Sequence, residues 1–312
     1  MSSSPTNFHA RRKREAARWS LAASGTLLAL KIVVGAVTGS AGILAEAVNS
    51  AADLVGSALA LLSVRASDEP PDHSHAYGHG KIENLSGAAT AALILVGGVF
   101  AIGEAVRHLL HPDPLPGLGW GIGVMGASAI VNLVVSRRLL RVGLETDSPA
   151  LAADGHHLQT DVVTSLGVLL GLTLVHLTGK LWWDSVAALG VSFLILRVGF
   201  GLAAEAVLTL SDAALPPDEE RALTAILTAH PEVRGFHKLR TRKSGSHRHI
   251  DVHVQIADTH TFVEAHRLTE ELEDRLRRAL PNLHPIIHIE PYEDEVRHQR
   301  QQHDAGTRSG DE

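Results

Sequence analysis

The 312-residue chain contains no cysteine and carries no excess of positive charge. Without cysteine there are no disulfides, thiolate metal sites or cysteine nucleophiles, so any metal chemistry must use His, Asp, Glu and Asn. The formal net charge of −6 argues against a nucleic-acid partner. We expect no cleavable signal peptide, because the first apolar run is long and follows the basic segment 1–19.

Apolar residues concentrate in residues 20–210, which we interpret as a membrane domain. Six runs approach the roughly 20 residues that a helix needs to cross a bilayer. A soluble protein with buried helices is the alternative, but consecutive runs of this length are rare in soluble folds. The six predicted spans are about 20–38, 42–64, 84–110, 117–138, 150–178 and 181–208.

The placement of Lys and Arg predicts the orientation in the membrane. These residues gather in segment 1–19 and in the connections 65–83 and 137–149. Cytoplasmic loops carry such an excess. We therefore expect a multi-pass protein of the cell (inner) membrane with both the N-terminus and the C-terminus in the cytoplasm.

Residues 211–292 predict a small cytosolic α+β domain. Pro216 and Pro217 open a helix, and segments 236–243 and 249–257 are predicted strands, of which the second alternates between apolar and polar residues. A second helix and a short strand at 285–290 follow. The order αββαβ is that of a ferredoxin-like domain with two helices on one face of a three-stranded sheet. The polar tail 293–312 is expected to be disordered.

Two pairs of polar residues lie inside predicted spans. Asn49 and Asp53 are four residues apart, and so are His157 and Asp161, so each pair lies on one face of a helix. Facing each other, they offer the N and O ligands of a tetrahedral divalent-metal site. The alternative is that they hydrogen-bond helices together. His156 points away from His157 and is not expected to be a ligand.

Three motifs within the span region and one in the tail resemble the cation diffusion facilitator family, particularly its bacterial zinc/iron-type efflux transporters. The motifs are ILAEAVNSAADL (43–54), YGHGKIE (77–83), ADGHHLQTD (153–161) and LRTRKSG (239–245). The resemblance implies a homodimer in the lipid bilayer that exports divalent metal in exchange for protons. It also implies that Asn49, Asp53, His157 and Asp161 form the transport site. Close zinc-type relatives carry Asp or His at the position of Asn49.

The same resemblance assigns further residues. Asp72, His75 and His79 look like the family's loop-borne metal site, with His73 as an extra neighbour. Lys81 and Asp212 resemble a charge pair between the membrane region and the tail. The positions that bind metal at the cytosolic dimer interface in relatives correspond to His237, His253, His266, His288 and Glu290. His249 lies on the same strand face, without a counterpart in the family.

The preferred function is therefore a metal/proton antiporter without an organic cofactor. Two alternatives are a metal sensor or scaffold that does not transport and an intramembrane metallohydrolase, for which no His-Glu-x-x-His motif is present. Histidine-bearing sites favour borderline ions. Zn is the first expectation, and Fe, Co, Cd, Mn and Ni remain open.

Overall fold

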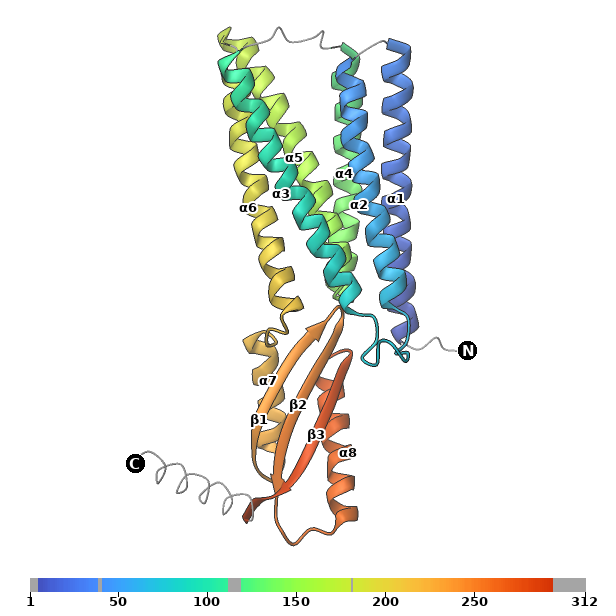
Figure 1. Ribbon diagram of the computed structural model, residues 1–312, viewed down its shortest axis with the longest axis vertical. Helices are drawn as coiled ribbons and strands as arrows, with labels where there is room; N and C mark the ends of the chain where they lie inside the picture. Colours follow the sequence, from blue (N-terminus) through green and yellow to red (C-terminus); the bar gives the residue numbers. More distant parts are fainter. Residues whose placement is uncertain (1–4, 39–40, 112–118, 181, 294–312) are drawn as a thin grey trace, which may run out of the picture. The chain divides into compact units, whose positions relative to one another are not determined.

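The computed structural model describes residues 5–38, 41–111, 119–180 and 182–293, and it divides into the units Met1–Leu210 and Ser211–Glu312. Within these residues, six long helices form the first unit, and two helices and a three-stranded sheet form the second (Figure 1). The six helices are α1 (Pro5–Thr38), α2 (Ala41–Ser67), α3 (Lys81–Leu110), α4 (Gly119–Thr146), α5 (Pro149–Thr178) and α6 (Trp182–Leu210).

Two helices extend well beyond their predicted spans. Helix α1 begins at Pro5, so most of the basic segment 1–19 is helical, and α4 continues to Thr146 through most of the predicted connection 137–149. Both extensions are rich in residues with good helix propensity. In α4, Leu139 and Val142 are buried and continue the apolar stripe, so packing stabilises the extra turns.

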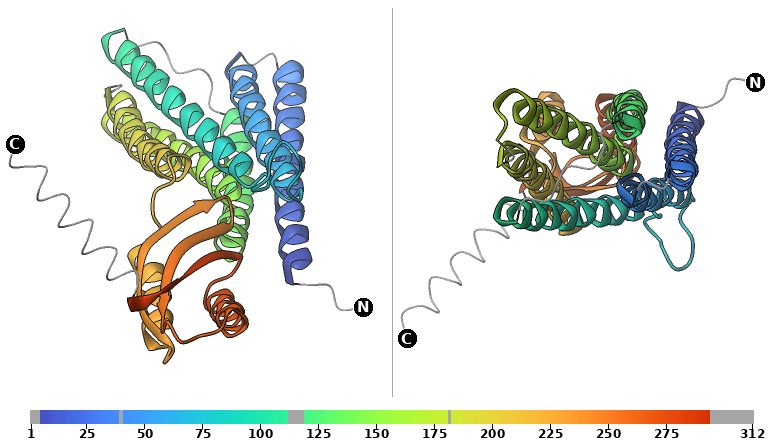
Figure 2. Two further views of the ribbon diagram at one scale, coloured as in Figure 1. Left: turned by 60° about the horizontal axis from the view of Figure 1, so that its bottom comes forward. Right: turned by 90° about the horizontal axis from the view of Figure 1, so that it is seen from above.

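Close helix contacts in the first unit depend on small residues. Helix α1 packs against α2, α3 against α6, and α4 against α5 (Figure 2). A Cβ at Gly167 of α5 would lie 2.2 Å from Val191 Cγ2 of α6, and one at Gly98 of α3 would lie 2.8 Å from Leu196 Cδ2. Such contacts let backbones approach closely, as helix association in lipid requires.

The outer surfaces of these helices are apolar. On α3, Val96, Val99 and Phe100 are 68%, 62% and 76% exposed, which fits side chains that face lipid rather than water. Among the described residues, α1, α3, α4, α5 and α6 contain segments long and apolar enough to cross a membrane. Helix α2 is not among these five, so the predicted second span stays a prediction.

The second unit contains α7 (Pro217–Ala229), β1 (Val233–Ser244), β2 (His247–Ile256), α8 (Phe262–Ala279) and β3 (Leu283–Pro291). The sheet order is β1-β2-β3, with β1 and β2 antiparallel and β2 and β3 parallel. The two helices and one face of β2 share a single core, in which Val252 and Val254 pack with Leu223 and Leu272.

Strands β1 and β2 begin three and two residues before their predicted starts. Pairing explains the difference, because Val233 is paired with Ile256 and Ser244 with His247, so these end residues join the ladder. The hairpin turn is reduced to Gly245 and Ser246, and Gly245 has a φ of 58°, a conformation that glycine adopts readily. The polar tail predicted to be disordered lies, apart from Glu293, outside the described residues.

Candidate metal centres

Helices α2 and α5 bring together the acids and the imidazole of the predicted transport site. Asp53 lies near the middle of α2, and His157 and Asp161 lie on consecutive turns of α5. One ligand atom from each of the three lies within 4.8 Å of the others, and His157 Nε2 is 3.3 Å from Asp53 Oδ1. The side chains of His157 and Asp53 are only 12% and 14% exposed. Side chains from two separate helices thus form one cluster, which offers one nitrogen donor and two oxygen donors.

A buried hydroxyl–carboxyl group supports this cluster one turn away. Asp154 is 0% exposed, and it accepts hydrogen bonds from Ser20 Oγ at 2.7 Å and Ser57 Oγ at 3.2 Å. Ser57 follows Asp53 by one turn of α2, and Asp154 precedes His157 by one turn of α5. These bonds tie α1, α2 and α5 together and fix the separation of the helices that carry the ligands.

The connection between α2 and α3 holds a second cluster, formed by Asp72, His75 and His79. Asp72 Oδ1 accepts hydrogen bonds from the backbone N–H groups of Ser74 and His75, while Oδ2 lies 3.4 Å from His79 Nε2. The hydrogen bond from the Ser74 hydroxyl and then that from the His75 backbone lower the pKa of Asp72 to about 2. The carboxylate is therefore ionised and held in position before any cation arrives.

A third cluster, of His237, His253, His288 and Glu290, lies on the sheet face opposite the helices. His253 is paired with His237 on β1 and with His288 on β3. Glu290 connects the histidines, since its oxygens lie 3.0 Å from His237 Nε2, 2.5 Å from His253 Nδ1 and 3.6 Å from His288 Nε2. Burial raises the pKa of Glu290, but the hydrogen bond and charge of His253, with the other two histidines, outweigh burial and lower it.

The described part of the chain does not bring every predicted ligand into these clusters. Asn49 lies one turn before Asp53 on α2 and is exposed. His73 is exposed in the loop, and His156 lies beside His157 without joining its cluster. His266 lies on α8, across the sheet from His253, and its Nε2 is 3.7 Å from Glu270. The metal-binding roles of Asn49 and His266 stay predictions.

A charge pair of Lys81 with Asp212, which belong to different units, also stays a prediction. Within the first unit, Lys81 Nζ donates a hydrogen bond of 3.5 Å to the backbone carbonyl of Leu210. Within the second, Asp212 Oδ1 lies 3.5 Å from Arg242 Nη1. Each member thus has a partner in its own unit.

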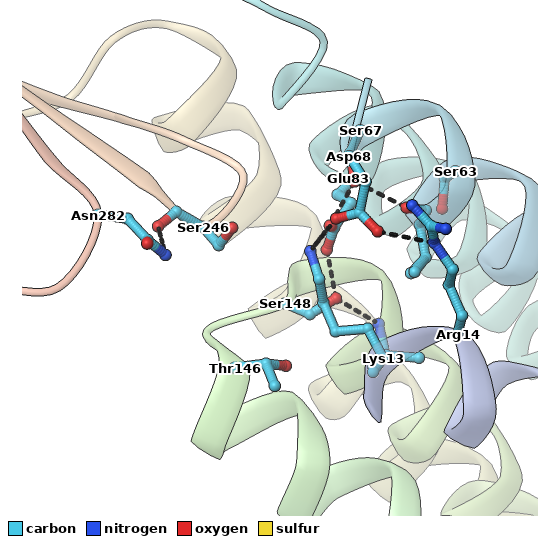
Figure 3. A network of polar contacts seen from close by, with 12 residues as sticks. Lys13, Arg14, Ser63, Ser67, Asp68, Glu83, Thr146, Ser148, Ser246 and Asn282 are labelled. Carbon is cyan, nitrogen blue, oxygen red and sulfur yellow. Dashed lines mark hydrogen bonds and ion pairs between the residues drawn. The ribbon is translucent and has the colours of Figure 1, made fainter. Parts of the chain in front are cut away.

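The sequence analysis did not predict a buried ionic network that lies at the two ends of the α2–α3 connection (Figure 3). This connection carries the loop cluster of Asp72, His75 and His79. Glu83 is 0% exposed, and its carboxylate accepts hydrogen bonds from Lys13 Nζ at 2.8 Å, Ser67 Oγ at 2.6 Å and the hydroxyl of Ser148. Lys13 is also 3.2 Å from Asp68. The network links α1, the end of α2, the start of α3 and the N-cap of α5. No local pattern predicts this network, because Lys13 lies in a basic run that is typical of a solvated segment.

Comparison with known proteins identifies the family to which the chain belongs. Residues 17–211 match the model for the cation efflux transmembrane domain, and residues 215–292 match that for the cation efflux protein cytoplasmic domain. The chain is therefore a membrane transporter with a helical transmembrane domain and a cytoplasmic domain that contains a small sheet. It belongs to the cation diffusion facilitator family of cation-efflux proteins, which confirms the resemblance found in its motifs.

Two sequence relatives cover most of the chain, and one solved structure covers about a quarter of it. The cation-efflux pump FieF of Klebsiella pneumoniae is 35% identical over 275 residues, which cover 86% of this chain and 90% of the pump. An uncharacterized transporter of Synechocystis, sll1263, is 35% identical over 287 residues, covering 91% and 92% of the two chains. The metal-bound C-terminal domain of the CzcD transporter from Thermotoga maritima is 24% identical, covers 24% of this chain and 87% of its own, and has a TM-score of 0.23.

Proposed function

We propose that this protein exports divalent metal cations from the cytoplasm in exchange for protons, by alternating access of the Asp53–His157–Asp161 cluster. The observation that carries the proposal is the convergence of these three side chains from α2 and α5, with ligand atoms within 4.8 Å of one another. Burying an ionisable group inside a membrane bundle costs free energy, so such groups usually pair with one another or bind a transported ion or proton.

The charge of the cluster suits a dication. Two ionised carboxylates and a neutral imidazole carry a charge of −2, which one divalent cation neutralises. The donors are one nitrogen and two oxygens, and the amide oxygen of Asn49 is the proposed fourth ligand, one turn from Asp53. A site of this composition suits Zn best among common ions and also accepts Fe, Co, Cd, Mn and Ni.

Protons provide the coupling in this proposal. Metal ligands bind in their deprotonated forms, so arrival of metal from the cytoplasm expels protons and arrival of protons from outside expels metal. His157 is the proposed principal proton carrier, because imidazole titrates near neutral pH. Its Nδ1 is buried and has no hydrogen-bond partner within the described ranges, which leaves that atom available for a proton, a water or the metal.

The remaining architecture follows the same proposal. All six helices cross the inner membrane, both termini are cytoplasmic, and the second unit is a ferredoxin-like domain through which two chains dimerise. Two further clusters bind metal and adjust the transport rate to the cytoplasmic metal concentration. They are the loop cluster of Asp72, His75 and His79 and the sheet cluster around Glu290. Their mixed nitrogen and oxygen donors suit the same borderline ions as the transport cluster.

Metal flux in sealed proteoliposomes tests the proposal. We expect Asp161→Asn to abolish zinc-dependent proton movement, because it replaces a carboxylate ligand by a neutral amide and removes half of the site's negative charge. Glu104→Gln is a matched control with the same change of charge, since Glu104 lies on α3, is 53% exposed and pairs with Arg107. Flux near the wild-type value in folded Asp161→Asn would refute the site. Metal binding without flux in the wild type would favour the sensor or scaffold alternative.

A further inference from the structure

A separate group of three histidines lies on the same face of the sheet as the Glu290 cluster. Its members are His247, His249 and His284. His249 and His284 are paired neighbours on β2 and β3, and His247 shares their face because it lies two residues before His249. His247 Nδ1 lies 3.1 Å from His284 Nε2, and the rings of His249 and His284 stack with centroids 5.3 Å apart. The group shares no residue with the Glu290 cluster, from which it is about 13 Å distant along the strand.

We propose that His247, His249 and His284 form an additional divalent-metal site of the cytosolic unit. In a tetrahedral zinc site, metal–nitrogen bonds of about 2.0–2.1 Å place two ring nitrogens about 3.3–3.4 Å apart. The observed 3.1 Å between His247 Nδ1 and His284 Nε2 is close to this separation. Two ligands are thus already placed, on the hairpin end of β2 and the start of β3.

His249 supplies the third nitrogen after a change in its side-chain torsions. Its ring already stacks on that of His284, with 23° between the ring planes.

The surrounding charges permit a dication. Arg242, which is paired with His249 across the strands, lies 3.5 Å from Asp212, and Arg277 near His284 lies 2.6 Å from Glu273. Each positive group thus has an acidic partner that reduces its repulsion. Three imidazoles without a carboxylate select Zn, Co, Ni or Cu over Mn and Mg. This selectivity differs from that of the Glu290 cluster, which includes a carboxylate.

The position of the site gives bound metal a structural consequence. Arg248 N donates a 3.0 Å hydrogen bond to Asn282 O, and Asn282 Nδ2 donates one of 3.3 Å to Ser246 O. These bonds join the β1–β2 turn to the connection before β3. A metal held by His247 and His284 would join the same two segments more strongly and stabilise this end of the sheet.

Counting bound cobalt tests the site on the full-length protein in detergent. Metal-free protein is dialysed to saturation against Co²⁺ and separately against Mn²⁺, and the metal per chain is measured. We expect His284→Ala and His247→Gln each to bind about one Co²⁺ per chain less than wild type, with little change in Mn²⁺. His260→Ala is the matched control, since His260 is a histidine on the loop before α8 that contacts Glu232.

The measurement needs no transport, so it fails or succeeds independently of the proposed antiport. Size-exclusion profiles establish that each variant is folded, and two different substitutions guard against one that does not fold. Equal Co²⁺ stoichiometry in wild type, His284→Ala and His247→Gln would overturn the proposal. An equal loss in His260→Ala would also overturn it, because the loss would then not depend on this cluster.

Discussion

Replacing Glu83 by Gln tests the buried ionic network that Glu83 forms with Lys13 and Asp68. The substitution keeps the volume of the side chain and removes its charge. Lys13, Arg14, Asp68 and Glu83 together carry no net charge, so the variant leaves one uncompensated positive charge around Lys13, which is 4% exposed. Removing one partner of a buried ion pair costs about 3–5 kcal/mol. Asp68, 3.2 Å from Lys13, offsets part of this cost, so we expect a value near 3 kcal/mol.

The thermal unfolding midpoint of the detergent-solubilised protein, followed by tryptophan fluorescence, measures the effect. A loss near 3 kcal/mol corresponds to a fall of about 6–12 °C for a domain of this size. Glu104→Gln on the same helix is the control, because Glu104 and Arg107 form an exposed pair worth about 0–1 kcal/mol.

A double-mutant cycle isolates the interaction of Glu83 with Lys13. Replacing Lys13 by Met in the Glu83→Gln background removes the uncompensated charge, so the double variant should unfold at a higher temperature than Glu83→Gln alone. Equal midpoints for Glu83→Gln and Glu104→Gln would refute the reasoning. The reasoning would also be refuted if Lys13→Met lowered the unfolding midpoint of Glu83→Gln by as much as it lowers that of the wild type.

Three further predictions concern single features of the chain. Asn49→Asp should tighten metal binding and make binding more dependent on pH at the acid end, because an added carboxylate near Asp53 attracts the dication. Metal titration across pH measures both effects, and identical curves for wild type and variant would mean that residue 49 does not face the metal. Truncation after Asp212 should weaken dimerisation and lower the metal sensitivity of flux while the transport cluster remains, and unchanged metal dependence would reject a regulatory tail. Thr261→Ala should destabilise the first turn of α8 by about 1 kcal/mol, because Thr261 and Glu264 form a capping box, and hydrogen exchange there should then accelerate.

Local patterns were sufficient to predict most elements of this fold. Long apolar runs predict the membrane helices, and alternation from His249 to Ala257 predicts β2 with Val252 and Val254 facing the core, as observed. Element ends were predicted less well. The first turns of α1 and the last turns of α4 depend on contacts such as the burial of Leu139, and the extra strand residues depend on pairing partners far away in the sequence.

The sequence by itself determined which residues are candidates for metal binding. Without cysteine, metal ligands must come from His, Asp, Glu and Asn, and the spacing along each helix together with the family motifs selects Asp53, His157 and Asp161 as candidates. Spacing along one helix defines one face because the helical repeat is a local property of the backbone.

Only the tertiary structure decided which groups from different elements meet. Lys13 and Glu83 are 70 residues apart, and their 2.8 Å contact exists because the bundle brings the N-terminal part of α1 next to the start of α3. His247 and His284 approach within 3.1 Å because β2 and β3 pair in parallel with one particular register. Contacts of this kind depend on how whole elements pack, and packing is set by the sum of many weak interactions rather than by any local pattern of residues.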